Sequence, residues 1–143
     1  MRLVLDTNIF ISALLRDSKV RELIVNSPLP LIFPEAILDE LKTHEGELLE
    51  KSGLAKEDYE KTISKLLAYV EAAPTESLKA YREEALRIVG QIDINDAIFF
   101  AAALANAPAI IWSDDKKLKK QNEVAVLNTA EIIQLFGRLD GEA

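Results

Sequence analysis

The sequence contains no cysteine among its 143 residues and only one histidine. The lack of cysteine excludes a disulfide framework, a catalytic thiol and a thiolate metal site, and it suits the reducing environment of a cytoplasm. With no thiol and a single imidazole, any bound metal ion must be held mainly by oxygen ligands. We therefore expect a cytoplasmic protein whose chemistry depends on carboxylates, hydroxyls and amines.

Long hydrophobic runs and basic charge are also scarce. The longest apolar stretch, residues 97–105, is too short to cross a bilayer, so we expect no membrane partner. The strand expected at residues 3–5 follows Met1 and Arg2 directly, so we expect no signal peptide. A formal net charge of −7 argues against a protein that coats nucleic acid electrostatically. It still allows an enzyme that binds nucleic acid through metal ions and a local basic strip.

The residues that are present indicate one folded domain, with 49 % hydrophobic and 29 % charged residues. Short apolar segments alternate with amphipathic ones, which predicts an α/β fold with a parallel sheet and helices on both faces. The expected strands are residues 3–5, 31–33, 70–73, 109–112 and 124–127. The expected helices are residues 9–15, 19–26, 35–49, 59–69, 78–89, 97–105 and 130–136. We expect residues 1–138 to form the domain and residues 139–143 to form a flexible tail.

Acidic residues stand at the ends of several of these elements. Asp6 follows the first strand, Asp115 follows a later one, and Asp96 lies at the amino end of a buried helix. Ligands of open α/β sheets gather at the carboxyl ends of the strands, although Asp6 could equally cap the helix that follows it. Glu40 lies at the edge of the apolar face of its helix, from which it could reach the same end of the sheet.

Converging carboxylates need a compensating charge. Two of them about 6 Å apart repel by roughly 3 kcal/mol at an effective dielectric near 20, and a divalent ion or a shared proton relieves this repulsion. Because the candidate ligands are hard oxygens, we expect Mg²⁺ or Mn²⁺ rather than Zn²⁺. Metal ions held in this way hydrolyse phosphodiesters by activating water and stabilising the leaving oxygen. The candidate metal ligands and catalytic residues are Asp6, Glu40, Asp96 and Asp115.

The polar residues beside these acids also have simpler interpretations. Asp93 is expected to cap the helix that contains Asp96, with an outer-sphere role at the metal as the alternative. Asp114 and Asp115 are adjacent and point in different directions, so only one of them is expected to reach the metal. The basic residues near the site are either solvated or in contact with phosphates, and they are Lys116, Lys117, Lys119, Lys120 and Arg16.

Four short motifs occur in the order and rough spacing of PIN-domain ribonucleases, and the sequence resembles this family over nearly its whole length. The motifs are Leu3-Val4-Leu5-Asp6-Thr7-Asn8, Leu38-Asp39-Glu40-Leu41, Asp93-Ile94-Asn95-Asp96-Ala97 and Trp112-Ser113-Asp114-Asp115-Lys116. The resemblance implies a small doubly wound α/β domain with a central parallel sheet of about five strands. It also implies a Mg²⁺- or Mn²⁺-dependent endoribonuclease. The family's acids correspond to Asp6, Glu40, Asp96 and Asp115, and its polar helper residues to Thr7, Asn8 and Ser113.

Among PIN-domain proteins of this size, the chain is similar to VapC-type toxins. This similarity implies RNA as substrate, a small antitoxin protein as partner and a homodimer. One alternative is a PIN-like module that binds RNA or protein without cleaving, which the presence of all four acids disfavours. A second alternative, a haloacid-dehalogenase-like phosphatase, is disfavoured because Asn8 stands where that class would have an aspartate. Residues 52–89 form a longer segment than in the most compact toxins, which leaves the mode of antitoxin binding open.

Overall fold

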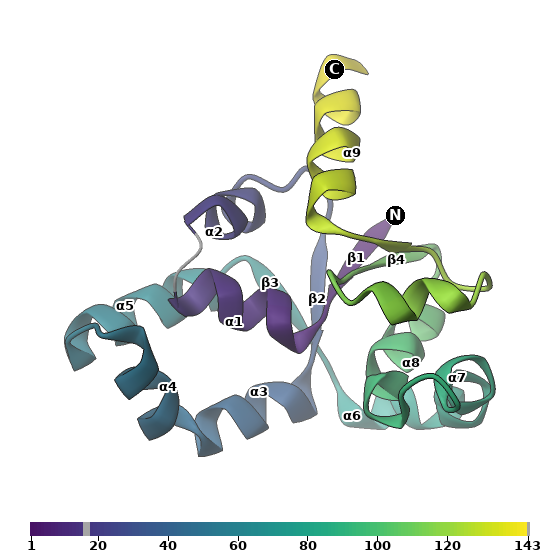
Figure 1. Ribbon diagram of the computed structural model, residues 1–143, viewed down its shortest axis with the longest axis horizontal. Helices are drawn as coiled ribbons and strands as arrows, with labels where there is room; N and C mark the ends of the chain where they lie inside the picture. Colours follow the sequence, from purple (N-terminus) through teal and green to yellow (C-terminus); the bar gives the residue numbers. More distant parts are fainter. Residues whose placement is uncertain (16–17, 143) are drawn as a thin grey trace.

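Five short strands form one parallel sheet at the centre of the structure (Figure 1). The computed structural model describes residues 1–15 and 18–142, and of Ser18 and Glu142 it describes the backbone alone. The strands are β1 (Arg2–Leu5), β2 (Leu31–Pro34), β3 (Val70–Ala73), β4 (Ala109–Trp112) and β5 (Val126–Leu127), in the spatial order β3-β2-β1-β4-β5. All neighbouring pairs are parallel, which confirms the predicted α/β class and its sheet.

Helices flank both faces of this sheet. The α-helices are α1 (Thr7–Leu15), α2 (Ser18–Val25), α3 (Glu35–Thr43), α4 (Glu45–Ser52), α5 (Lys56–Leu67), α6 (Thr75–Leu78), α7 (Arg82–Val89), α8 (Ala97–Ala105) and α9 (Thr129–Glu142). The 3-10 helices are η1 (Lys79–Tyr81), η2 (Ile94–Asp96) and η3 (Lys116–Lys120). In Figure 1, α1, α4 and α5 lie on one side of the strands, and α7 and α8 lie on the other. None of the described helices is both long enough and apolar enough to span a membrane.

The helix α8 fills the core on one face of the sheet. It buries Phe99, Phe100 and the three alanines at residues 101–103. The small alanine side chains let its backbone lie close to β1, β2 and β4, all of which it contacts. A helix without a polar face must be covered on its outer side as well, and α6 and α7 provide this cover. The packing therefore fixes the start of α8, directly after Asp96, against the sheet.

The strand order reverses between β1 and β4, and this reversal positions the first acidic residue. Leu5 of β1 pairs in register with Trp112 of β4. The amide of Asp6 donates a hydrogen bond to the carbonyl of Trp112, 3.2 Å away. Asp6 and Ser113 therefore leave the sheet next to each other at its carboxyl edge. The crevice outside such a reversal is where open α/β sheets bind their ligands.

Two predicted helices are interrupted in the structure. The helix expected at residues 35–49 breaks at His44, which has φ −98° and ψ 18°, into α3 and α4. Helix α3 buries Ile37 and contacts β2, whereas α4 buries Leu48 and contacts α1. The break thus lets one continuous apolar pattern pack on two differently oriented surfaces. The helix expected at residues 78–89 is likewise divided among α6, η1 and α7, each of which contacts α8.

The closing helix α9 is longer than the predicted residues 130–136. Its start is stabilised by a capping box: the Glu131 carboxylate accepts from the Asn128 amide at 3.0 Å, and the Asn128 side chain accepts from the Glu131 amide at 2.9 Å. The glycines near the chain end are weak helix formers, which is why the sequence predicted a shorter helix. The helix nevertheless continues through both glycines to Glu142. The flexibility expected of residues 139–143 stays a prediction.

Candidate metal centre

Asp6 is buried at the carboxyl end of β1, with 5 % of its surface exposed. Its Oδ1 accepts a hydrogen bond from the amide of Ile9, 2.8 Å away in the first turn of α1. Burial raises the pKa of Asp6, the Ser113 side chain and the Ile9 amide oppose this rise, and the charges of Asp114 and Asp115 add to it. Asp6 therefore caps α1, as one interpretation of the sequence predicted, and also lies among acidic neighbours.

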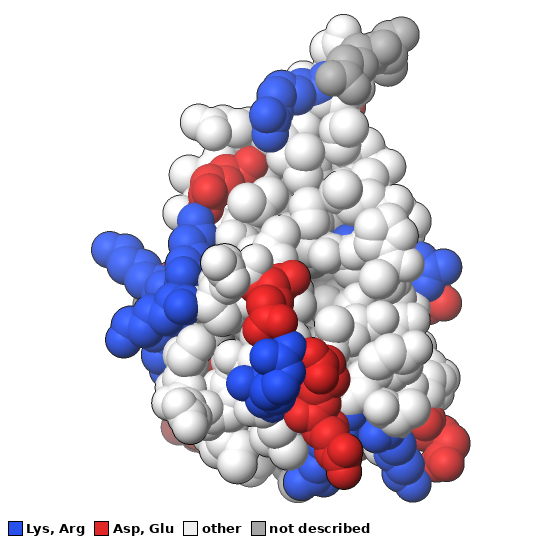
Figure 2. Space-filling view, turned by 90° about the vertical axis from the view of Figure 1, so that its right-hand side faces the viewer, with Lys and Arg blue, Asp and Glu red and all other residues white. Residues whose placement is uncertain are grey.

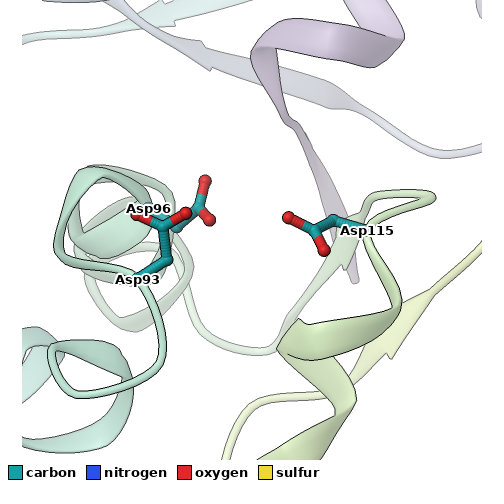
Figure 3. Close-up of side chains that lie close together, drawn as sticks. All are labelled: Asp93, Asp96 and Asp115. Carbon is teal, nitrogen blue, oxygen red and sulfur yellow. The ribbon is translucent and has the colours of Figure 1, made fainter.

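Three carboxylates meet near this edge of the sheet (Figure 3). Asp93, Asp96 and Asp115 each offer one oxygen, and these oxygens lie within 4.8 Å of one another. Asp93 and Asp96 come from the turn that contains η2, and Asp115 faces them from the loop after β4. We call these three residues the acid cluster. The structure thus brings together two of the predicted ligands, Asp96 and Asp115, and adds Asp93 to them.

The electrostatics of Asp96 show that the acid cluster has an excess of negative charge. The pKa of Asp96 is raised to about 6, first by partial burial and then by the charges of Asp93, Asp115 and Asp6. The ammonium of Lys117 opposes this rise. Asp6 thus acts on Asp96 although it lies outside the group of three oxygens. A carboxyl group that resists ionisation beside other carboxylates marks a site with too little positive charge of its own.

One lysine partly neutralises the acid cluster. The ammonium nitrogen of Lys117 lies 2.8 Å from Asp93 Oδ2 and 3.2 Å from Asp115 Oδ2. The hydrogen bond from Lys117 is the main cause of a lowered pKa of Asp93, and these contacts raise the pKa of Lys117 to about 12. In the sequence, Lys117 looks the same as the other lysines of its basic run, so these contacts could not be predicted.

Asp93 caps η2 and also belongs to the acid cluster. Its Oδ1 accepts a hydrogen bond from the amide of Asn95 at 3.0 Å, which confirms the predicted capping role. Its place in the acid cluster fits the alternative that the sequence left open, an outer-sphere role at a metal, and that role stays a prediction. The available signal was its distance of three residues from Asp96, which puts both side chains on one side of a tight turn.

Asp114 and Asp115 point to different parts of the molecule. The carboxylate of Asp114 accepts hydrogen bonds from the amide and the hydroxyl of Thr129, at 2.7 and 2.9 Å, and so binds the start of α9. Asp115 caps η3 by accepting from the Lys117 amide at 3.2 Å, and its own amide donates to the Ser113 hydroxyl oxygen at 3.1 Å. Of these two neighbouring aspartates, only Asp115 belongs to the acid cluster found among the described residues.

Glu40 is not part of the acid cluster that the described residues form. It is exposed on α3 and lines a surface groove of about 360 Å³ between α3, α6, α7, η2 and α8. The groove extends to Ile94 and Asn95, the two residues between Asp93 and Asp96. Glu40 therefore faces a groove that ends beside the acid cluster, and a role for its carboxylate at a metal stays a prediction.

Most of the remaining predicted residues lie in the first turn of α1 or on η3. Thr7 is partly buried and Asn8 is exposed, both in the first turn of α1. The lysines Lys116, Lys119 and Lys120 are exposed on η3, where Lys119 pairs with Glu131. Arg16 lies outside the described residues. On the face drawn in Figure 2, basic side chains gather at the left edge, and acidic and basic side chains mix in the middle.

The donor set suits a hard divalent cation. The acid cluster supplies three carboxylates against one ammonium, and carboxylate oxygens are the ligands that Mg²⁺ and Mn²⁺ prefer. The one histidine of the chain, His44, lies at the break between α3 and α4, with its Nδ1 3.9 Å from Glu47. Because the sequence also has no cysteine, the site offers no ligand that would favour Zn²⁺.

Comparison with known proteins agrees with this architecture. A family model described as PIN domain matches residues 4–135. One chain in the crystal structure of VapBC2 from Rickettsia felis bound to a DNA fragment from their promoter has a similar fold, with a TM-score of 0.65 and 21 % sequence identity. The match covers 90 % of this chain and 98 % of that one. No curated protein sequence matches the chain.

Proposed function

Because the chain belongs to the PIN domain family, we propose that it is a ribonuclease that depends on Mg²⁺ or Mn²⁺ and cleaves phosphodiester bonds within RNA. The strongest support is the acid cluster, whose three carboxylates lie at the switch point of a parallel sheet. Phosphodiester hydrolysis accumulates negative charge on oxygen, and carboxylate-held divalent ions are suited to neutralise it.

We assign the metal to the carboxylates of Asp96 and Asp115, with Asp6 as a third ligand and Glu40 as a candidate for a second ion or for orienting water. When bound, the ion supplies activation of the attacking water and neutralisation of the leaving oxygen. To Ser113, whose side chain favours the charged form of Asp6, we assign the role of orienting the Asp6 carboxylate. The side chains of Thr7 and Asn8 are assigned supporting polar roles beside Asp6.

We assign RNA contacts to the basic residues after the acid cluster. Lys116, Lys119 and Lys120 are exposed on η3, which begins directly after Asp115. A chain of net charge −7 needs a local basic strip in order to approach a polyanion, and the ammonium groups of these lysines provide one. Arg16 is a further candidate from the sequence.

The fold also supports a proposal about partners. The similar chain comes from a structure of VapBC2 with promoter DNA, and we infer that the present chain is the toxin of a toxin–antitoxin pair. It would then act in the cytoplasm, form a homodimer and be inhibited by a small antitoxin protein. Co-purification of the chain with the product of a short neighbouring gene would support this assignment, whereas a chain that is harmless when expressed alone would contradict it.

The test of the nuclease proposal is cleavage of a labelled RNA by the purified chain. We expect cleavage with Mg²⁺ or Mn²⁺, none after addition of EDTA, and recovery when the metal is restored in excess. Asp96→Asn keeps the size of the side chain and removes a ligand charge. It should lower kcat/KM by about 100-fold or more.

The matched control is Glu84→Gln, which makes the same chemical change at an exposed carboxylate of α7. It should cleave like the parent chain. RNA binding that persists with no cleavage under any metal condition would favour the non-catalytic binding module instead. Cleavage that survives both EDTA and Asp96→Asn would show that the activity does not come from the acid cluster.

A further inference from the structure

Lys117 binds two carboxylates of the acid cluster, and one of them, Asp115, is an assigned ligand of the proposed metal site. Its ammonium contacts Asp93 on the η2 side and Asp115 on the η3 side, at 2.8 and 3.2 Å. Both partners belong to the acid cluster, whose oxygens lie within 4.8 Å of one another. The lysine therefore bridges the two segments that form the site.

The other lysines of η3 do not share this position. Lys119 pairs with Glu131 of α9, and Lys116 and Lys120 are exposed on the surface. Lys117 is partly buried, and its backbone amide donates to Asp115 Oδ1 at 3.2 Å. This hydrogen bond fixes the start of the Lys117 side chain beside Asp115. The geometry thus separates one lysine from a run that looks uniform in sequence.

A divalent ion held by Asp115 would compete with the Lys117 ammonium for the charge of that carboxylate. A metal ion coordinates carboxylate oxygens directly and so weakens their attraction for a second cation nearby. The two cations also repel each other strongly at such short range, because the site is partly shielded from water. The ion and the ammonium therefore disfavour each other at this site. The ammonium is the one that can move, because it ends a flexible four-carbon chain.

We propose that Lys117 is an internal counter-ion of the metal site, which neutralises Asp93 and Asp115 in the metal-free protein and is displaced when a divalent ion binds. The inference rests on the proposed function, since it concerns the same metal site. Its consequence is that Lys117 lowers the metal affinity of the chain while it keeps the acid cluster together. Metal binding then frees an ammonium group beside the site of cleavage.

The test compares metal affinity in two variants with the same change of charge. Lys117→Met removes the counter-ion, and Lys116→Met removes an exposed lysine next to it. Isothermal titration with Mn²⁺ should give a dissociation constant about tenfold lower for Lys117→Met than for the parent chain, because the metal no longer has to break two ion pairs. Lys116→Met should stay within about twofold, since its charge acts through solvent. Without metal, Lys117→Met should melt at a lower temperature than Lys116→Met.

Several outcomes separate this inference from the nuclease proposal. An unchanged or weaker Mn²⁺ affinity in Lys117→Met, with normal binding by the parent chain, would overturn the counter-ion role alone. Failure of both proteins to bind Mn²⁺ would overturn the metal site itself. If Lys117→Met does not fold without metal, the parent chain can be followed by NMR with carbon-13 at lysine Cε, with Lys117→Arg used for assignment. The Lys117 signal should then move on addition of Mg²⁺ while the Lys120 signal does not, and an unmoved Lys117 signal would contradict displacement.

Discussion

Two ionic groups in this molecule shift the pKa of a carboxyl group in opposite directions. Arg87 of α7 donates two hydrogen bonds to Glu123, at 2.6 and 3.2 Å, and also binds Glu84. These contacts lower the pKa of Glu84, so the charged form is favoured. At Asp96 of the acid cluster the balance is reversed, because burial and neighbouring carboxylates raise its pKa to about 6. The Arg87 group supplies the cation that its acids need, whereas the acid cluster does not.

This difference separates an ion pair that serves the fold from the cluster to which we assign a metal ion. The guanidinium of Arg87 reaches two carboxylates at once and ties α7 to the loop before β5. Its partners are about half exposed, so the group contributes modestly to stability. The acid cluster carries a greater excess of negative charge and holds Asp96 in an unfavourable environment. Proteins tolerate such destabilisation where binding later relieves it.

The largest effect that distinguishes the two groups is stabilisation by metal. At a Mn²⁺ concentration about 100 times the dissociation constant, binding to the native state should stabilise the parent chain by about 2.7 kcal/mol, or about 8 °C in Tm. Asp96→Asn should lose most of this shift, and Glu84→Gln should keep it. Differential scanning fluorimetry with and without Mn²⁺ measures all three proteins. An equal Mn²⁺ shift in Asp96→Asn would remove Asp96 from the metal site.

A smaller effect, of opposite sign in the two groups, is expected without metal. Asp96→Asn removes a charge that its neighbours disfavour, and should stabilise the apo protein by about 1 kcal/mol once solvent screening is taken into account. Glu84→Gln removes a charge that Arg87 favours, and should lower the stability slightly. Urea unfolding in the presence of EDTA gives both free energies. Loss of stability in Asp96→Asn would make Asp96 a structural residue like Glu84.

The same comparison predicts a pH dependence. The pKa of Asp96 is about 6 in the folded chain, whereas an unperturbed aspartate has a pKa of 3.8. At pH values between these two, the folded chain therefore binds more protons than the unfolded chain. Its contribution to stability therefore falls as pH rises from about 4 to about 6. The stability difference between Asp96→Asn and the parent chain should be small near pH 4 and reach its maximum above pH 6. A difference that is constant over this range would contradict the raised pKa.

Most of the fold was predictable because it depends on local patterns. Strands such as β1 and β4 are short apolar runs bounded by polar turns, and α8 is apolar on every side, so their types could be predicted from sequence. The break at His44 was not predictable, since the apolar spacing of residues 35–49 fits one continuous helix. Only the positions of β2 and α1 in space decide that Ile37 and Leu48 pack against different elements.

The site was predictable in its components and less so in its arrangement. The positions of Asp6, Asp96 and Asp115 at the ends of elements followed from chain order and from the general rule for parallel sheets. The contacts of Asp93 and Lys117 depend on the approach of η2 to η3, which are far apart in sequence. No local pattern specifies such an approach, because it follows from the packing of α8 on the sheet.

The smallest predicted effect concerns Asp114, which adjoins Asp115 but binds Thr129 instead. Asp114→Ala removes hydrogen bonds to the first residue of α9, while the capping box of Asn128 and Glu131 stays intact. We therefore expect a loss of stability of only about 0.5–1 kcal/mol, typical of a partly redundant helix cap. Urea unfolding measures this loss, and titration with Mn²⁺ should give the parent affinity, because the Asp114 carboxylate faces α9. A weaker Mn²⁺ affinity without loss of stability would instead place Asp114 at the metal, and the assignment of neighbouring acids to opposite roles would be wrong.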